Sequence, residues 1–127
     1  VDLLRNDISR VCEDNSVRVD KLCELESFAN VHHLVSTVRG KLSAGKTSTD
    51  LLAACFPGGS ITGAPKRRAM EIIAELEPTA RGPYCGAIGY LGADGSMDSA
   101  IAIRTMTVKD QRVTFQAGGG IVADSEP

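Results

Sequence analysis

The sequence predicts an α+β fold in which helices pack on a mostly antiparallel sheet. Two central segments, residues 47–56 and 65–77, carry apolar residues at helical spacing. From residue 84 onward, extended runs alternate with turns of only a few residues, and turns that short join antiparallel neighbours. The chain has 127 residues, of which 43% are apolar, and this is enough for one domain with a buried core.

The first 42 residues predict one helix and two strands. In VDLLRNDISRV, apolar residues recur at i, i+3, i+7 and i+10, which is one face of a helix. The runs SVRV (16–19) and FANVHHLVSTVRGKL (28–42) are rich in β-branched residues, and the second alternates between two faces. We expect both runs to be strands, separated from the helix by the polar turn EDNS.

The two central helices carry start and stop signals. Thr47 can cap the first with Asp50 three residues later, and Pro57 ends it. The second helix is expected to begin near Pro65 and to end before Pro78. Its apolar face consists of Ala69, Ile72, Ile73 and Leu76.

The last third of the chain predicts strands joined by turns. The extended runs are YCGAIGYL, MDSAIAIRTMTV, RVTFQA and GGGIVA. Arg104 would then lie in mid-strand, beside Ala100, Ala102 and Met106 on a mainly apolar face. An arginine in that position needs a partner, which is either a protein carboxylate or a bidentate ligand carboxylate.

Composition excludes several classes of partner. The net charge is −2, and there are two Tyr, three Phe and no Trp, so neither nucleic acid nor an anionic membrane is favoured. The four cysteines lie far apart without a C-x-x-C pair, which argues against a zinc knuckle or a redox dithiol and favours reduced thiols in the cytoplasm. We find neither a signal peptide nor an apolar run long enough to cross a bilayer.

The stretch PGGSITGAPKRR (57–68) has glycines and a lysine just before a helix. A Walker loop requires G-x-x-x-x-G-K-[ST], but Ala64 stands where the lysine belongs and no strand precedes the loop. What remains is a helix N-terminus with free amides and the Thr62 hydroxyl, which suits an anion such as a carboxylate. The alternative is that Thr62 only caps its own helix.

A second anion feature is the triple glycine Gly118, Gly119 and Gly120, placed where a strand should continue. Glycine weakens a strand interior, so three in a row indicate either a bulge or the close approach of a ligand to the backbone amides. With the Thr62 loop and Arg104, the sequence has three separate anion features and no nucleotide motif. We therefore expect a small polycarboxylate as the ligand.

Adjacent histidines suggest a metal site, but His32 and His33 would point to opposite faces of a strand and cannot easily bind one ion. At most one of them faces a site, and a hydrogen-bonded structural role is the alternative. Tyr84 opens a strand beside the loop that follows the second central helix, where ordinary edge packing is the alternative to ligand contact. No residue of the chain is assigned as a metal ligand.

Six strings carry a resemblance to a known family. They are VDLLRND, VHHLVSTVRGKL, FPGGSITGAPKRRAMEII, RGPYCGAIGY, MDSAIAIRT and AGGGIVADSEP. In this order they resemble the chorismate-utilising enzymes, and the resemblance runs from the first residue to the last. Within the family, FPGGSITGAPK and YCGAIGYL look most like the enzymes that aminate chorismate on the route to p-aminobenzoate and folate, and the anthranilate-forming enzymes are the runner-up.

The resemblance implies that chorismate, a dicarboxylate with an enolpyruvyl group, lies against these features. It implies catalytic positions for His33, facing the ring, and for Thr62, at the ring end of the pocket. A second group of residues would hold the enolpyruvyl carboxylate, namely Tyr84, Arg104 and the backbone amides of Gly118, Gly119 and Gly120.

The resemblance also implies that residues 1–127 form a single partial domain, the C-terminal part of a larger α/β sandwich, truncated at both ends. In such enzymes Mg²⁺ bridges two glutamates and the ring carboxylate, and both glutamates, like the lysine used for covalent catalysis, would fall outside this chain. Ammonia would come from a glutamine amidotransferase subunit or domain. We expect the complete enzyme to aminate chorismate, and this chain alone to be inactive or a non-catalytic chorismate-binding fragment.

Overall fold

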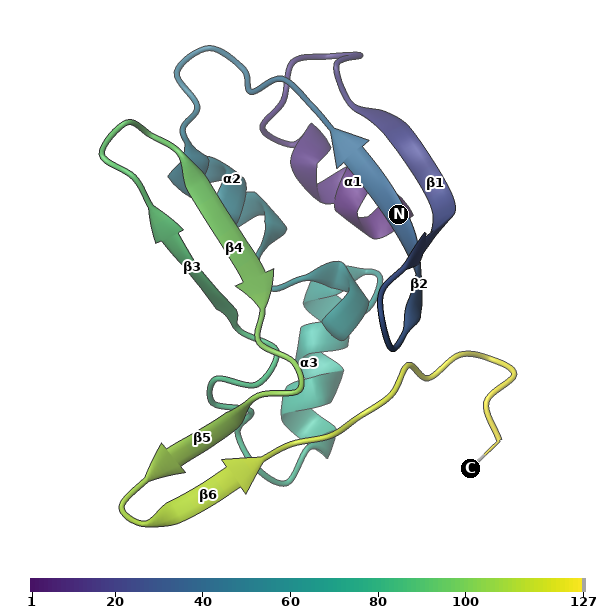
Figure 1. Ribbon diagram of the computed structural model, residues 1–127, viewed down its shortest axis with the longest axis vertical. Helices are drawn as coiled ribbons and strands as arrows, with labels where there is room; N and C mark the ends of the chain where they lie inside the picture. Colours follow the sequence, from purple (N-terminus) through teal and green to yellow (C-terminus); the bar gives the residue numbers. More distant parts are fainter. Residues whose placement is uncertain (127) are drawn as a thin grey trace. The chain divides into compact units, whose positions relative to one another are not determined.

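The computed structural model describes residues 1–126, and the chain divides into two compact units, Val1–Cys55 and Phe56–Pro127 (Figure 1). Helices and antiparallel strands are both present, which confirms the α+β class. The strands of residues 1–126 form three separate two-stranded antiparallel sheets, however, and not the one sheet expected. No helix in this part of the chain has the length and apolar character needed to cross a bilayer.

Two helices, α1 (Asp2–Ser9) and α2 (Ser48–Cys55), pack side by side in the first unit (Figure 1). The core of this unit is formed by Ile8, Val11 and Cys12, each 7% exposed. Ile8 and Val11 belong to the apolar face expected from the sequence, so the helix and its buried side are confirmed.

Helix α2 begins with the capping box predicted from the sequence. The backbone N–H of Thr47 donates to Asp50 Oδ2 at 2.9 Å, and the Asp50 N–H donates to Thr47 Oγ1 at 3.4 Å. The Thr47 amide is the main cause of a lowered Asp50 pKa. Two backbone donors at this helix end are therefore satisfied by side chains of the same segment.

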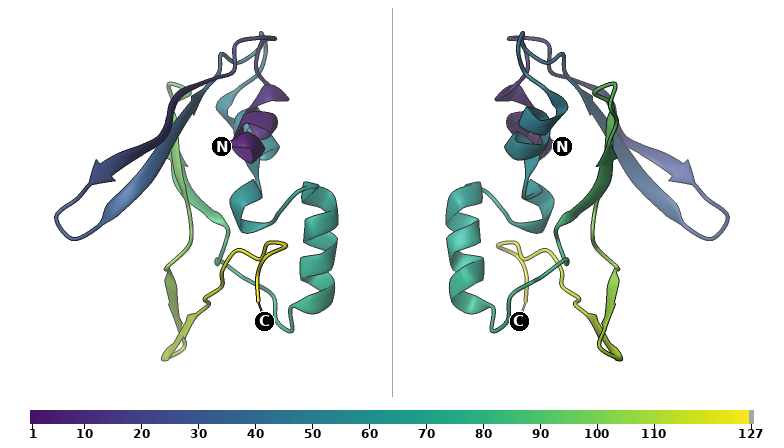
Figure 2. Two further views of the ribbon diagram at one scale, coloured as in Figure 1. Left: turned by 90° about the vertical axis from the view of Figure 1, so that its right-hand side faces the viewer. Right: turned by 90° about the vertical axis from the view of Figure 1, so that its left-hand side faces the viewer.

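The remaining elements of the first unit are β1 (Arg18–Ser27) and β2 (His32–Arg39), an antiparallel ribbon that extends away from α1 and α2 (Figure 2). Strand β1 continues through residues 20–27, which lack apolar alternation and give no strand signal. Pairing with β2 decides their conformation. Strand β2 begins later than expected, because the Phe28 N–H donates to the Val31 carbonyl at 2.8 Å and closes a turn.

The second unit contains a short 3₁₀ helix, one α helix and two hairpins (Figure 1). Strand β3 pairs with β4, and β5 pairs with β6. In chain order the elements are η1 (Gly59–Ile61), α3 (Lys66–Leu76), β3 (Ala87–Leu91), β4 (Met97–Ile101), β5 (Met106–Lys109) and β6 (Arg112–Phe115). Helix α3 lies where the sequence predicts it, although Pro65 is its N-cap and not its first helical residue.

Two strand predictions in this unit are wrong. The run 97–108 is not one strand, because Ile103 N–H donates to the Ile101 carbonyl at 2.9 Å and Arg104 adopts a left-handed backbone with φ 52°. This local turn separates β4 from β5. The run GGGIVA is not a strand either, since the chain after Phe115 pairs with no strand among the described residues.

Apolar side chains on the hairpins are exposed. All five residues of β3 are exposed, with Ile88 at 69% and Leu91 at 50%. A two-stranded hairpin is marginally stable in water unless another layer covers it. The β3–β4 hairpin thus offers apolar surface for packing against further protein.

Candidate functional site

Tyr84 lies in a tightly bonded loop between α3 and β3. Its backbone N–H donates to the Arg81 carbonyl at 3.1 Å. The next residue, Cys85, is buried, and its N–H donates to the Ala102 carbonyl at 2.9 Å, which continues the pairing of β3 with β4 by one step. Desolvation is the main cause that raises the pKa of Tyr84, with Cys85 adding to it, so the phenol stays protonated at neutral pH and can donate a hydrogen bond.

Arg81 is the best-connected side chain of this loop. Its Nε and Nη2 donate to the Glu77 carboxylate at 2.9 and 2.6 Å, and Nη1 donates to the Ile61 carbonyl at 2.7 Å. The guanidinium carbon lies 5.9 Å from the centre of the Tyr84 ring. Hydrogen bonding to Arg81 lowers the pKa of Glu77, so the pair is charged at neutral pH.

Thr62 does not cap the helix that follows it, so the alternative of a simple cap is wrong. Its hydroxyl donates back to the Gly58 carbonyl at 2.9 Å. Helix α3 starts with Pro65 in an extended conformation and without a side-chain cap. Among residues 1–126, α3 thus differs from α2, whose start is capped by Asp50.

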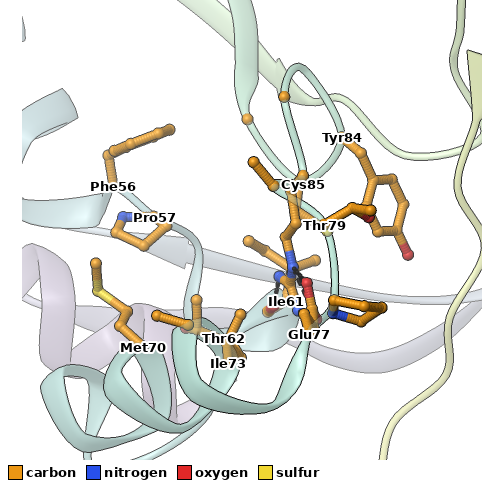
Figure 3. A pocket seen from close by; sticks show the side chains of 16 residues that line it. Phe56, Pro57, Ile61, Thr62, Met70, Ile73, Glu77, Thr79, Tyr84 and Cys85 are labelled. Atoms are coloured by element: carbon orange, nitrogen blue, oxygen red, sulfur yellow. Dashed lines mark hydrogen bonds and ion pairs between the residues drawn. The ribbon is translucent and has the colours of Figure 1, made fainter.

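A cavity of about 520 Å³ lies within the second unit, between α3 and the Tyr84 loop. Thr62 and Tyr84, two residues singled out from the sequence, both line it. Phe56 and Met70 lie toward one end and Tyr84 toward the other (Figure 3). The volume is in the range of small-molecule sites, and the lining is mainly apolar with a few polar groups, as in such sites.

The triple glycine meets the Tyr84 loop at one point. A Cβ added to Gly118 would lie 3.1 Å from the Tyr84 hydroxyl oxygen, so this backbone and this phenol are neighbours. Gln116 anchors the same segment, because its Nε2 donates to the Ala80 carbonyl at 3.2 Å. Gly119 and Gly120 are exposed and have open space around them. The structure thus brings together Tyr84 and the beginning of the glycine run.

Arg104 differs from its expected setting. It is exposed, and within residues 1–126 its side chain makes no hydrogen bond or ion pair, so no structural salt bridge forms among the described residues. The expected mid-strand position on an apolar face is also wrong, because the residue lies in the break between β4 and β5. It lies two residues after Ala102, whose N–H donates to the Gly86 carbonyl at 3.0 Å beside the Tyr84 loop.

The histidines belong to the first unit. The Nδ1 atom of His32 lies 2.9 Å from Ser27 Oγ, a hydrogen-bond distance, and the ring of His33 makes an edge contact with Phe28 at 5.8 Å between centroids. Both histidines are exposed. Neither is near enough acidic or thiol groups for an ion, since residues 1–126 contain no group of three or more His, Cys, Asp or Glu that could hold one.

Sequence reasoning missed Arg81 and Gln116. Arg81 belongs to the string RGPYCGAIGY, but no role was assigned to it. Its spacing of four residues from Glu77 was the only sequence signal for an ion pair. Gln116 had no signal, because its partner Ala80 lies 36 residues away. The second unit contains the Tyr84 phenol, the exposed Arg104 guanidinium and the amides of the glycine run, which are donors suited to a carboxylate.

Comparison with known proteins identifies the family of this chain. A family model described as chorismate binding enzyme matches residues 1–127. The chain is 62% identical to aminodeoxychorismate synthase component 1 of Klebsiella aerogenes over 99% of its length, and 59% identical to anthranilate synthase component 1 of Streptomyces coelicolor over 100%. It covers 28% and 25% of these relatives, so it spans about a quarter of their length.

A solved structure agrees with the sequence comparison. Anthranilate synthase component I from Streptococcus pneumoniae matches 98% of this chain with a TM-score of 0.90 and 56% identity, and the match covers 28% of that protein. The two kinds of synthase are similarly close in identity, so the identities do not separate them. The chain belongs to the family of chorismate-binding enzymes.

Proposed function

We propose that this chain supplies the enolpyruvyl-carboxylate end of a chorismate site in a chorismate-aminating synthase. Tyr84, Arg104 and the amides of Gly118 to Gly120 hold that carboxylate. Two observations carry the proposal: the hydroxyl oxygen of the protonated Tyr84 phenol lies 3.1 Å from the Cβ position of Gly118, and the exposed Arg104 side chain has no protein partner among residues 1–126. A carboxylate supplies the missing partner.

The ring end of the site is the second part of the proposal. Thr62 lines the cavity just before α3, and its hydroxyl is proposed to lie at the ring end of the site. His33 stays a proposed catalytic residue, as the family resemblance implies. We propose Mg²⁺ as the metal of the complete enzyme, where it would supply charge stabilisation to the reacting ring.

For the whole protein we propose aminodeoxychorismate synthase component I, which converts chorismate to 4-amino-4-deoxychorismate for p-aminobenzoate and folate. Ammonia comes from a glutamine amidotransferase subunit or domain. The strings FPGGSITGAPK and YCGAIGYL favour this product. The alternative is anthranilate synthase component I, and the 59% identity to one such enzyme keeps it as a second candidate. The cytoplasmic location stays a prediction.

One incubation tests the proposal and separates the two products. The full-length protein that carries this chain is mixed with chorismate, ammonium and Mg²⁺, and the products are separated and weighed by mass spectrometry. We expect a product that keeps the enolpyruvyl group, without release of pyruvate. Anthranilate with an equal amount of pyruvate would support the alternative, and unchanged chorismate would contradict both.

A further inference from the structure

Arg81 connects two segments on which the proposed site depends. Two of its guanidinium nitrogens, Nε and Nη2, donate to the Glu77 carboxylate just after α3. The third, Nη1, donates to the carbonyl of Ile61, one residue before Thr62, at 2.7 Å. Its guanidinium also lies over the Tyr84 ring at 5.9 Å. The Arg81 side chain is only 23% exposed, so these contacts are partly shielded from water.

The loop that carries Arg81 is anchored on the opposite side as well. Gln116 donates to the Ala80 carbonyl at 3.2 Å, two residues before Gly118. The Arg81 side chain is therefore bonded to the segment that precedes Thr62, and the neighbouring Ala80 carbonyl is bonded to Gln116 in the segment that precedes Gly118. Tyr84 is held by its backbone to the Arg81 carbonyl, so a displacement of Arg81 moves Tyr84 with it.

We propose that Arg81 is a positioning residue that sets the place of Tyr84 in the carboxylate site, and this inference rests on the proposed function. The guanidinium suits this role because its planar fork binds Glu77 through two nitrogens while a third reaches Ile61. A lysine has one nitrogen and cannot reproduce that geometry. Arg81 also lines the cavity, but its guanidinium nitrogens are bonded to Glu77 and Ile61, so in this proposal it acts through Tyr84.

An ordinary ion pair on the same helix provides the matched control. Arg68 Nη1 lies 3.2 Å from Glu71 Oε2, its side chain is 60% exposed, and among the described residues it bonds to no second segment. Exposed pairs of this kind contribute little to stability. Arg68→Met therefore removes an arginine–glutamate pair from α3 without loosening the Tyr84 loop.

The kinetic test compares Arg81→Met with Arg68→Met in the full-length protein, with chorismate varied at saturating ammonium and Mg²⁺. We expect Arg81→Met to raise KM for chorismate about tenfold with kcat within about threefold, because a contact remote from the reacting ring acts mainly on binding. Arg68→Met is expected to leave both constants unchanged. An unchanged KM in Arg81→Met, with the protein folded by circular dichroism, would overturn the inference.

A double-mutant cycle distinguishes positioning from a general loss of structure. If Arg81 acts through the Tyr84 hydroxyl, the effect of Arg81→Met on KM should largely disappear in a Tyr84→Phe background. A merely structural arginine would give the same fold-change in both backgrounds. Additive effects would therefore contradict the positioning role.

Amide hydrogen exchange keeps this inference separable from the proposed function. We expect faster exchange at the Thr62 and Tyr84 amides in Arg81→Met than in Arg68→Met, without any substrate present. Equal rates would overturn the positioning role. If the unmodified protein neither binds nor consumes chorismate, the proposed function fails, and the exchange comparison still decides whether Arg81 holds the loop.

Discussion

Two arginines of the second unit are used in opposite ways. The guanidinium nitrogens of Arg81 donate to Glu77 and Ile61, and the group lies against the Tyr84 ring. Arg104 lies in an exposed break between two strands, and its side chain has no protein partner among the described residues. The first has the contacts of a structural residue. The second has the open donors that an anionic ligand requires.

The backbone shows the same difference. The Arg81 segment is bonded to three other parts of its unit, at Ile61, Ala102 and Gln116. Arg104 instead adopts a left-handed conformation that is unfavourable for a residue with a Cβ. Such conformations cluster at ligand sites, which fits the proposed carboxylate contact. The comparison teaches that contacts, and not residue type, separate a supporting arginine from a ligand-binding one.

The largest expected effect comes from Arg104→Ala in the full-length protein. Loss of a charge-assisted contact to the enolpyruvyl carboxylate should cost about 1.5–3 kcal/mol, so kcat/KM for chorismate falls at least about tenfold while the unfolding midpoint stays the same. Arg112→Ala, an exposed arginine on β6, is the control and should leave the kinetics unchanged. Normal kinetics in Arg104→Ala would remove this residue from the site.

The left-handed backbone at Arg104 gives a second prediction. Arg104→Gly should be more stable than Arg104→Ala by about 0.5–1 kcal/mol, because relief of the strain exceeds the entropy that glycine loses on folding. Both variants should bind chorismate equally weakly. Urea unfolding of the two full-length variants measures the difference, and equal stabilities would show that the break between β4 and β5 carries no strain.

Crowding of the Tyr84 hydroxyl should give a smaller effect. In Gly118→Ala the new Cβ lies 3.1 Å from that oxygen, so the phenol must move by a few tenths of an ångström. We expect KM for chorismate to rise by roughly threefold, since small displacements of a positioned group weaken binding. The same change in a Tyr84→Phe background should add nothing. If Gly118→Ala still raised KM by the full amount in the Tyr84→Phe background, Gly118 would act independently of the phenol.

The smallest effect concerns pH and the Arg81 ion pair. Hydrogen bonding to Arg81 holds the Glu77 pKa below its ordinary value of 4.5. The folded pKa is depressed, so the stabilisation is fully present above pH 4.5 and is lost as the pH falls through the folded pKa. Thermal unfolding of Glu77→Gln should therefore show a lower midpoint than the unmodified protein at pH 7, and a smaller difference at pH 3. If the difference in unfolding midpoint were the same at pH 7 and pH 3, it would contradict a charged pair of Glu77 and Arg81.

Local sequence signals predicted the helices well. The capping box of Thr47 and Asp50 and the apolar periods of α1 and α3 depend on residues three or four positions apart, and all three helices form where these signals lie. The β1 strand was predicted for only its first residues, because a charged run such as DKLCELES becomes a strand through its partner β2.

The candidate site, too, was only partly predictable from local sequence signals. Tyr84, Arg104 and Gly118 were singled out from residue type and from a family resemblance, and their roles remain proposals. The residue pattern of 97–108 could not predict that Arg104 lies outside a strand, because the turn depends on a backbone hydrogen bond from Ile103 to Ile101. Nor could it predict Arg81 or Gln116 as anchors, since their partners at Ile61 and Ala80 lie 20 and 36 residues away.

The central claim is that Arg104, and not Arg81, receives the enolpyruvyl carboxylate beside Tyr84 and Gly118. A crystal structure of the full-length protein with bound chorismate measures this directly. The account predicts that this carboxylate accepts hydrogen bonds from the Arg104 guanidinium and the Tyr84 hydroxyl, while Arg81 keeps its fork on Glu77. A carboxylate bound to Arg81, or chorismate bound with Arg104 still exposed to solvent, would contradict it.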